Sequence, residues 1–582
     1  MERLEAKTVK GKTYYYYSHW GWRDGRCRRL WQKYLGKLED IVAAVQGRGF
    51  AAQSAEVFDF GLPAAVWAEC RRQRIAEEVD AHRPKRRQGL SIGTYMALAA
   101  VNRAVEPASK RAFGEWFEAT CLRRTLPAAT PPMLSSQRFW DHLDMLSVDD
   151  AKAAWTAIIN GVLKREGIQP AEVCYDGTNF YTFISTFNQA CTVARRGKNK
   201  QGRGNLRQVS YALFCDRESH LPLYYDVYQG NQADATQFPL MITRFREFLA
   251  TRLNHATVDA EGVTVVFDKG NNSAENMALL DTERLHFVGA LKATDVPALA
   301  TISNASPTFI SCTRPSLEGI KYFATAHAIH GKSRQVVVTY NPELFRTQWL
   351  TLLNDIEHAT QALSTLQQRL ADRANGLIKG GRAPTQQSIA TACKEILSRQ
   401  FLKTIFTLAA TSNLQLEFSQ DQAVLANIAA TVLGQKILFS SRLKWHPEQI
   451  IDAYHGQYVI EHAFKEMKDR RTGSWWPLNH WTDQNIHLHG FYCTLAILLK
   501  TIIHRRVKLA GIQVSMPRLL KELESVKEVV LLGGKPAKGG VHRTQTVLTR
   551  LSDVQARILR TLGLEKIKSG AKGQVIWARR DR

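Results

Sequence analysis

The stretch from residue 172 to residue 270 constrains the fold of this chain more than any other. It contains three successive segments rich in Val, Tyr, Phe and Ile, which predict β-strands of hairpin character. A helix is predicted at about 234–252, and VTVVFDKG at 263–270 is almost continuously apolar, as in a strand buried on both faces. This order predicts a mixed α/β protein in which helices cover a mixed sheet. The three strand segments are EVCYDGTNFYTFIS (172–185), QVSYALFCDRES (208–219) and LPLYYDVYQG (221–230).

The regions before this stretch differ in texture. The chain has 582 residues, so we expect several structural units, about three to five. An aromatic and basic segment at 7–36 predicts a twisted hairpin, which we interpret either as a DNA-contacting arm or as a solvated ribbon. PKRRQG at 84–89 is typical of a linker, and 90–164 is helical in pattern. Within it, SSQRFWDHLDML at 135–146 predicts an exposed DNA-binding helix or, as we prefer, a packed amphipathic helix.

Residues 345–400 predict a helical hairpin whose role is packing or subunit contact. GGRAPT at 380–385 interrupts the pattern, and a second amphipathic helix follows it. In the first helix, apolar residues alternate three and four positions apart, the spacing of a coiled-coil seam. These residues are Ile356, Ala359, Leu363, Leu366 and Leu370. Farther along the chain, Pro447 predicts the start of another helix and Gly473 its end.

The net charge of +25 predicts a polyanionic partner, with nucleic acid as the first candidate and an acidic membrane surface as the second. The most apolar run, FYCTLAILLKTII at 491–503, is too short to span a bilayer and contains Lys500. The N-terminal MERLEAKTVK has no apolar signal core, and nine scattered cysteines fit a reducing cytoplasm. We therefore expect a nucleic-acid-binding protein without export or membrane insertion.

Two aspartates are predicted at the ends of strands, where ligands tend to bind. Asp176 in VCYDGT is followed by Gly177, and Asp268 in VVFDKGNNS ends the buried run. Either one alone is also explained as a turn residue, since Asp-Gly is a common turn pair. Asp216 and Asp226 also lie in or near predicted strands, and we interpret both as structural.

A third carboxylate, Glu461, lies in the helix predicted after Pro447. At roughly 100° per residue, Tyr454, Glu461 and Lys468 fall on one line of the helix, and Gln457 lies close to it. An apolar stripe adjoins this line, so we expect Glu461 to border buried surface and not to lie on the open face. The stripe consists of Ile460, Phe464 and Met467.

Three carboxylates gathered in one pocket repel one another, and their pKa values rise unless a cation is present. A divalent ion relieves the repulsion, and ligands that are all oxygen favour Mg²⁺ or Mn²⁺. Two such ions, roughly 4 Å apart, can activate a water or hydroxyl and stabilise the leaving oxygen of a phosphodiester. Together with the net charge of +25, this chemistry predicts a nucleic-acid strand as the substrate.

Asp176, Asp268 and Glu461 resemble the DDE triad of bacterial insertion-sequence transposases with an RNase H-like catalytic core. The subgroup carries the signature Y-x2-R-x3-E-x6-K around the third acid, and Tyr454 and Lys468 match it in register. The resemblance extends over most of the chain. Its further segments are KYLGK (33–37), PKRRQG (84–89), YDGTNFY (175–181), GNLRQVSYALFCD (204–216), GNQAD (230–234), VFDKGNNS (266–273) and HWTDQ (480–484).

The chain departs from this signature at Gln457, which occupies the position of the arginine. Glutamine cannot supply a charged, bidentate contact to phosphate, so His455 or a nearby lysine would have to compensate. The departure puts the role of the arginine in doubt and leaves the expected metal site unchanged.

The resemblance implies an enzyme that cleaves DNA strands at transposon ends and transfers them into target DNA. It implies Asp176, Asp268 and Glu461 as catalytic residues and ligands of two Mg²⁺ or Mn²⁺ ions. It also implies a homodimer on paired ends, cleavage in trans, and a cytoplasmic, nucleoid-associated bacterial protein. The expected organisation is an N-terminal basic hairpin module (1–50), a helical region (51–165), the RNase H-like core in two parts (166–290 and 441–505), an insertion domain between them (291–440) and a basic C-terminal region (506–582).

Further DNA contacts are predicted on the same double-stranded partner. The run RRGKNKQGRGNLR at 195–207 lies between two predicted strands, and we interpret it as a phosphate contact or as a solvated loop. HWTDQ at 480–484 is expected to cap or pack the next helix. We interpret the basic tail after 500 as a nonspecific DNA contact or as an ordinary solvated surface. The predicted DNA-binding residues are Tyr454, Gln457, Lys468, Arg195, Arg196, Lys198, Lys200, Arg203 and Arg207.

Two other functions fit the same residues. A nuclease of this fold would cut DNA without the strand-transfer step. A transposase-derived protein that has become inactive would bind DNA with no metal-dependent turnover.

Overall fold

The chain packs as two compact units, one formed by residues 1–146 and 499–582 and the other by residues 147–498. The computed structural model describes residues 1–23, 26–45, 52–83, 89–198, 202–232, 234–253, 262–410, 415–471, 473, 475–533, 544–565, 568–569 and 575–576. All three predicted acids belong to the second unit. The finer domain boundaries expected from the sequence stay predictions.

The first unit joins the two ends of the chain. Strand β17 lies between β18 and β4, and it pairs with each of them antiparallel. Pairing between segments so distant in the chain leaves no local pattern in the sequence. Its strands are β1 (Glu2–Val9), β2 (Lys12–Arg23), β3 (Arg26–Gly36), β4 (Ala52–Asp59), β17 (Lys527–Gly533), β18 (Thr544–Leu548), β19 (Lys568–Ser569) and β20 (Val575–Ile576). Its helices are α1 (Leu38–Val45), α2 (Gly61–Arg72), α3 (Ile75–His82), α4 (Ile92–Val105), α5 (Phe113–Glu118), α6 (Leu122–Thr125), α7 (Ser136–Leu143), α19 (Met516–Glu524) and α20 (Asp553–Thr561).

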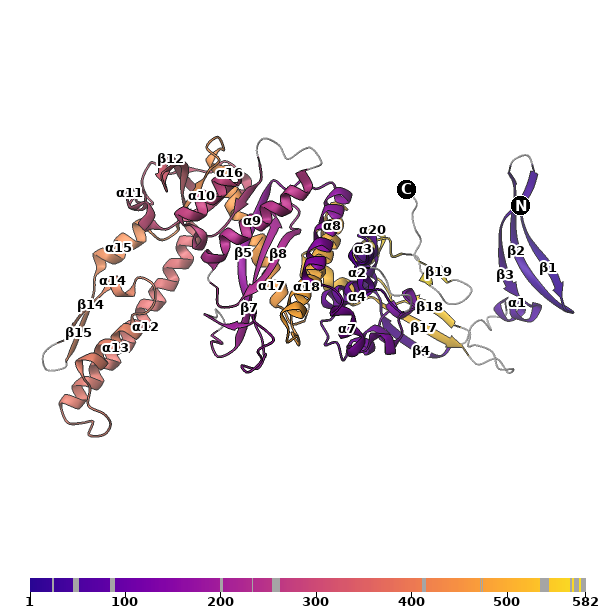
Figure 1. The fold of residues 1–582 in the computed structure, drawn as a ribbon, viewed down its shortest axis with the longest axis horizontal. Helices are drawn as coiled ribbons and strands as arrows, with labels where there is room; N and C mark the ends of the chain where they lie inside the picture. The colour runs from indigo at the N-terminus through magenta and orange to yellow at the C-terminus, as the bar shows by residue number, and fades with distance from the viewer. Residues whose placement is uncertain are drawn as a thin grey trace. The chain divides into compact units, whose positions relative to one another are not determined.

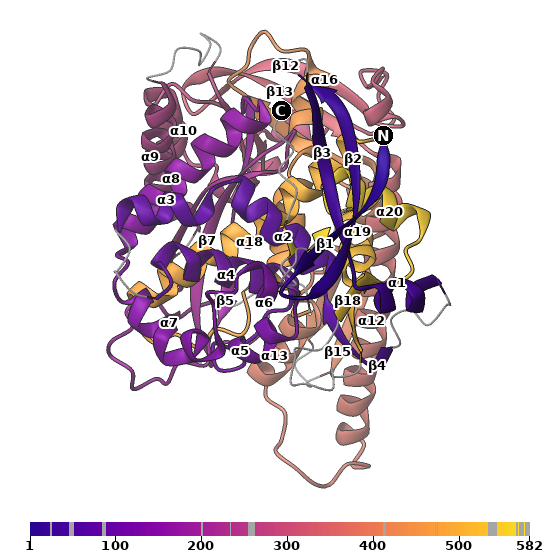
Figure 2. The same cartoon turned by 90° about the vertical axis from the view of Figure 1, so that its right-hand side faces the viewer.

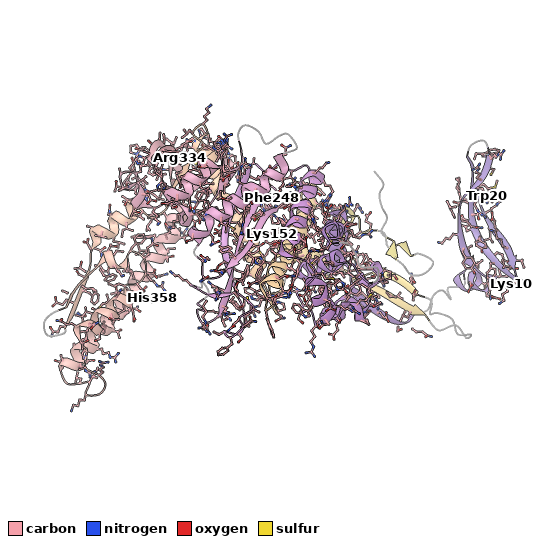
Figure 3. All side chains as sticks on the ribbon, in the orientation of Figure 1. Lys10, Trp20, Lys152, Phe248, Arg334 and His358 are labelled. Carbon is pink, nitrogen blue, oxygen red and sulfur yellow. The ribbon has the colours of Figure 1, made fainter. Side chains whose placement is uncertain are left out.

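The predicted N-terminal hairpin is in fact a three-stranded antiparallel sheet in the order β1-β2-β3. Lys10 and Gly11 take positive φ values of 47° and 75°, which form a tight turn between β1 and β2. Trp20, labelled in Figure 3, donates a hydrogen bond from Nε1 to Oε1 of Glu5 at 2.6 Å. The predicted turn at 24–25 and most of the predicted linker at 84–89 lie outside the described residues.

Helix α7 corresponds to the segment for which the sequence left two interpretations. Ser135 caps its first turn, accepting a hydrogen bond from the amide of Arg138. Phe139, His142 and Leu143 are buried, as expected of a packed amphipathic helix. A role of α7 in DNA binding stays untested.

The second unit is built on one large mixed sheet with helices on both faces. The strands of this sheet are β5 (Glu172–Tyr181), β6 (Arg195–Arg196), β7 (Arg207–Asp216), β8 (Pro222–Gln229), β9 (Thr264–Val266), β10 (His286–Leu291), β11 (Ile310–Ser311), β12 (Lys321–Ile329), β13 (Lys332–Tyr340) and β16 (Gln435–Ser440). Strands β14 (Phe406–Ala410) and β15 (Leu416–Gln420) of the same unit pair with each other in a separate sheet. The helices of this unit are α8 (Val148–Glu166), α9 (Asp234–Leu253), α10 (Ala274–Thr282), α11 (Pro297–Ala300), α12 (Pro342–Ala374), α13 (Gln386–Ile396), α14 (Leu402–Ile405), α15 (Gln422–Thr431), α16 (Pro447–His455), α17 (Tyr458–Lys468) and the first part of α18 (Asp483–Leu509).

The core of this sheet has the strand order β8-β7-β5-β9-β10. The pairs β8–β7 and β7–β5 are antiparallel, whereas β5–β9 and β9–β10 are parallel. The first strand of the core, β5, is therefore central, with a hairpin-connected antiparallel half on one side and a parallel half on the other. This is the predicted RNase H-like arrangement, and it confirms the mixed α/β fold class.

Helices cover both faces of the core sheet (Figure 1). On one face, Phe238 of α9 contacts the rings of Tyr175 on β5 and Phe267 just after β9. On the other face, Tyr211 of β7 packs on Phe464 of α17, and its hydroxyl hydrogen-bonds Thr494 of α18 at 2.6 Å. Figure 3 labels Lys152 on α8 and Phe248 on α9, two further residues of the flanking helices.

The sheet continues beyond the core into the range predicted as an insertion domain. β16 pairs antiparallel with β10 and also with β13, which is followed in the sheet by β12 and β11. The predicted helical hairpin is present as α12 and α13, and Figure 2 shows it extending away from the sheet. Ile356, Ala359, Leu363 and Leu370 of the predicted seam are buried, and Leu366 packs against the same cluster.

The apolar run predicted at 491–503 belongs to a longer helix, α18, of 27 residues. Within the described part of the chain, this helix is long and apolar enough to cross a membrane, and 89% of its most apolar window is buried inside the protein. Such burial is typical of a helix in a protein core. Lys500 is among its buried residues.

Candidate active site

The register of two parallel strands brings Asp176 and Asp268 to one edge of the core sheet. Cys174 of β5 lies opposite Val266, the last residue of β9, and each aspartate follows two residues later. Tyr175 and Phe267, the residues before the aspartates, both point to α9. Because side chains alternate along an extended chain, both aspartates point to the opposite face, where α17 packs.

The prediction that Asp176 ends its strand is wrong. β5 continues to Tyr181, and Gly177 pairs with Ala212 inside the sheet. The Asp-Gly pair is therefore not a turn. The edge exists because the neighbouring strand β9 stops at Val266, so its parallel pairing with β5 ends at Cys174. Asp268, by contrast, does leave its strand and caps the short 3₁₀ turn at Lys269–Asn271.

The single helix predicted between Pro447 and Gly473 is two helices. α16 ends at His455, α17 begins at Tyr458, and α17 stops at Lys468. Between them the backbone tightens, with the Gln457 amide donating to the carbonyl of Tyr454 at 3.1 Å. A Cβ on Gly456 would lie 2.7–2.8 Å from the side chain of Arg217, so this position favours a glycine.

A cavity of about 860 Å³ contains all three predicted acids. Asp176 and Asp268 form its sheet wall, and Tyr454, Gln457 and Glu461 from α16–α17 form its helix wall. Residues of α12 and β16 are also part of the lining. Residues nearly 300 positions apart in the chain therefore meet in one cavity.

Tyr454 links the two walls of the cavity. Its hydroxyl donates a hydrogen bond to Oδ1 of Asp268 at 3.1 Å. Burial raises the pKa of Tyr454 well above its ordinary value, and Asp268, Glu461 and Asp176 raise it further. The tyrosine therefore stays protonated and acts as a hydrogen-bond donor to the acid cluster.

Lys468 lies on the other side of Glu461, in a second cavity of about 550 Å³. Asp176 and Glu461 line both cavities, so they stand between them. The ammonium of Lys468 donates to Oγ1 of Thr178 at 2.5 Å. Thr178 follows Asp176 by two residues on β5, so this hydrogen bond links α17 to the strand that carries the first acid.

The donor set of the cavity suits a divalent metal ion only in part. Carboxylate oxygens are the ligands that Mg²⁺ and Mn²⁺ prefer, and the three acids line one space. Glu461 and Asp268 are exposed, so their oxygens are accessible to an ion. In the described parts of the chain, however, no three Asp, Glu, His or Cys side chains stand close enough together to hold one ion. A shared ion therefore requires the three side chains to approach one another.

Residues 169–499 match the family model described as Transposase DDE domain, which is more than half of the chain. The chain belongs to this DDE transposase family. A solved structure, a cryo-EM structure of the piggyBac transposase synaptic complex with hairpin DNA, is similar over 79% of this chain and 79% of that one, at 10% sequence identity and a TM-score of 0.35. No curated protein sequence matches the chain.

The matched range of this DDE transposase includes Asp176, Asp268 and Glu461. DDE transposases generally use divalent metal ions. The bacterial insertion-sequence subgroup and its Tyr-Arg-Glu-Lys signature stay predictions for this chain.

Those residues of the predicted basic run that the structure describes lie outside both cavities. Arg195 and Arg196 form β6 at the far end of β7, where Gln208 pairs with Tyr181. Tyr181 is five residues beyond Asp176, or about 17 Å at the usual rise of a strand. Arg207 donates to the carbonyl of Asn188 at 3.0 Å, so it also organises the preceding loop.

Two other residues of this run, Arg203 and Lys198, lie outside β6 and β7. Arg203 lies over the ring of Tyr181 at 4.5 Å, and Lys198 is exposed. Lys200 lies outside the described residues. The DNA-binding role of the whole run stays a prediction.

The residues expected to be structural behave as predicted. Asp216 is buried and accepts hydrogen bonds from the amide and hydroxyl of Ser219, which close the turn before β8. Asp226 is buried beside Arg244 and Lys152. In the predicted capping segment, the hydroxyl of Thr482 accepts from the amide of Asn485 at 3.3 Å, whereas Asp483 accepts from the amides of Thr192 and Val193 in a distant loop at 2.7 and 2.8 Å.

Sequence reasoning missed the lysines that line the main cavity, namely Lys269, Lys292 and Lys436. Lys269 directly follows Asp268, so its position could have been inferred. Lys436 is the second residue of β16, whose place beside β10 follows from long-range pairing that no local pattern predicts.

Proposed function

We propose that this protein is a DNA transposase that cleaves strands at transposon ends and transfers them into target DNA. The observation that supports the proposal most is the meeting of three carboxylates from three distant segments in one cavity, within the range that the transposase family model matches. The net charge of +25 suits DNA as the substrate.

Asp176, Asp268 and Glu461 would hold the metal. Bound Mg²⁺ or Mn²⁺, as two ions, would supply activation of a water or hydroxyl and stabilisation of the leaving phosphodiester oxygen. Tyr454 orients Asp268 through its hydroxyl. Lys468 keeps α17 on β5 by its contact with Thr178, and its ammonium lies beside the acids, where a DNA phosphate would approach.

Further contacts with DNA are proposed away from the acids. The N-terminal sheet carries exposed Trp22, Trp31 and Tyr34 among basic residues, which suits a duplex-binding arm. Arg195, Arg196 and Arg203 lie around the Tyr181 end of β5, and Tyr181 is about 17 Å from Asp176 along the strand, so they suit a contact with a duplex bound at the acids. We further propose that the protein acts as a homodimer on paired transposon ends in the bacterial cytoplasm, as members of the subgroup it resembles are expected to do.

One observation favours a second candidate, an inactive transposase-derived DNA-binding protein. In the described residues, no three potential ligands stand close enough to hold one ion. A nuclease without strand transfer is the other alternative. Both alternatives are separated from a transposase by the products that the protein makes.

The experiment uses purified full-length protein, Mg²⁺ and a plasmid carrying the inverted repeats that bracket the gene. Asp176→Asn, Asp268→Asn and Glu461→Gln are expected to abolish cleavage while DNA binding in a gel-shift assay stays within about twofold of wild type, because each change removes only one charge at the site. Joined donor–target products identify a transposase, and cut ends without joined products identify a nuclease. Unreduced cleavage by all three variants would refute the proposed site.

A further inference from the structure

The cavity of the acids contains a hydrogen-bond donor without an acceptor. Nε2 of Gln457 is buried and has no hydrogen-bond partner among the described residues. Gln457 lines the cavity between Tyr454 and Glu461. Because leaving a buried N–H group unpaired is unfavourable, the position suits a ligand that brings an acceptor oxygen.

The same cavity contains a lysine that has no carboxylate partner of its own. Lys436 lines the cavity, and no ion pair to it is found in the described parts of the chain. Its ammonium lies 5.5 Å from the ring centroid of Tyr454, whose hydroxyl contacts Asp268. The positive charge of Lys436 is therefore separated from Asp268 by the side chain of Tyr454.

Lys436 is held on a rigid element. Strand β16 pairs with β10 on one side and with β13 on the other, where Lys436 lies opposite Thr339. Lys269 and Lys292, which also line the cavity, stand in or beside short 3₁₀ turns. A cation on a strand inside a sheet is positioned more precisely than one on a turn.

His455, which also lines the cavity, favours its neutral form. Burial lowers the pKa of His455, and the neighbouring Lys436 lowers it further, while Asp452 raises it. His455 is therefore neutral at pH 7. The positive charge at this end of the cavity comes from lysine.

We propose that Lys436 and Gln457 together form a phosphate subsite that binds a backbone phosphate of the DNA strand entering the cavity. Lys436 supplies the charge and Gln457 supplies the hydrogen bond, so that two residues from different elements do what one arginine side chain can do alone. This inference rests on the proposed function, since it names how the same cavity binds its substrate.

The test compares Lys436→Ala with Lys444→Ala in the full-length protein. Lys444 is exposed and lies outside the cavity, so its variant removes the same charge without touching the subsite. Binding to a fluorescent duplex is measured over a series of salt concentrations. Lys436→Ala should weaken binding about tenfold and lower the slope of log affinity against log salt by about one. Lys444→Ala should change neither.

A rescue experiment tests the division of roles. Gln457→Ala should weaken binding without changing the salt slope, because an amide carries no charge. Gln457→Arg in the Lys436→Ala background should restore both the affinity and the slope. Thermal unfolding midpoints equal to that of wild type would show that the variants are folded.

The inference is overturned if Lys436→Ala and Lys444→Ala bind alike, or if Gln457→Arg fails to rescue Lys436→Ala. These outcomes are read from binding alone. Failure of the proposed function would instead be seen as unreduced cleavage by all three acid variants, so the two failures are distinguishable.

Discussion

The sheet wall and the helix wall of the cavity hold their acids in different ways. Asp176 lies inside the sheet, where β5 pairs it with Leu213 of β7, and Asp268 follows the end of β9 and caps a 3₁₀ turn. Glu461 is exposed on α17, and its position depends on the packing of Ile460, Phe464 and Met467 below it. We therefore expect the sheet wall, and Asp176 above all, to be more rigid than the helix wall, which would adjust toward a shared ion.

The largest effect is expected from changing the length of one acid on each wall. Asp176→Glu should lower the cleavage rate about 100-fold, because a displaced group on a rigid wall cannot be corrected. Glu461→Asp should lower it only about tenfold, because α17 can shift. Single-turnover cleavage of end DNA at saturating protein measures both. Equal losses would show that the two walls do not differ in rigidity.

The next largest effect is expected on stability, from the hydrogen bond between Lys468 on the helix wall and Thr178 on the sheet wall. Thr178→Val removes the acceptor of the Lys468 ammonium and should lower the free energy of unfolding by about 2 kcal/mol. Urea unfolding monitored by circular dichroism gives this value. As a control, Thr282→Val makes the same substitution at the exposed end of α10, away from the site. A similar loss of unfolding free energy in both variants would show that the contact of Lys468 with Thr178 does not stabilise the packing of α17.

A smaller effect is expected where the helix wall touches the sheet wall through Tyr454. Tyr454→Phe removes the hydrogen bond to Asp268 and should reduce cleavage roughly fivefold, corresponding to about 1 kcal/mol. DNA binding should be unchanged. The matched control is Tyr458→Phe, which lines the same cavity and contacts His220 instead of an acid. If Tyr454→Phe cleaved DNA at the rate of wild type, Tyr454 would not orient Asp268.

The smallest effect is a pH dependence away from both walls. Burial raises the pKa of Asp483, but the hydrogen bonds from Thr192 and Val193 outweigh it and hold the pKa below its ordinary value. The stability that Asp483 contributes is therefore present above about pH 4 and is lost as the pH falls through the lowered value. Asp483→Asn should cost about 1 kcal/mol at pH 7 and progressively less below pH 4. A pH-independent difference would contradict the ionised contact.

Local patterns predicted much of the core sheet and its acids. The aromatic and β-branched runs identified β5, β7 and β8, and the apolar run before Asp268 identified the short strand β9. Two features of the site were not predicted, because each depends on a segment that is distant in the sequence. The edge at Asp176 exists only where β9 ends, and the break at Gly456 lies where Arg217 approaches.

Long-range pairing limited the rest of the prediction. β16 joins the core sheet between β10 and β13, which brings Lys436 into the cavity. β17 pairs with β4 across more than 450 residues, so the C-terminal region shares a sheet with the N-terminal half. Neither pairing can be read from periodicity, which reports only a strand and its buried face.

The sharpest test of the metal site replaces Asp268 with cysteine. A thiolate binds Mg²⁺ poorly and accepts the softer Mn²⁺ more readily, so Asp268→Cys should be inactive with Mg²⁺ and recover strand cleavage with Mn²⁺. Wild type should cleave with either ion. The predicted result would place Asp268 on the catalytic metal. Equal activity of Asp268→Cys with Mg²⁺ and Mn²⁺ would contradict the proposal that the acids of the two walls share a metal ion.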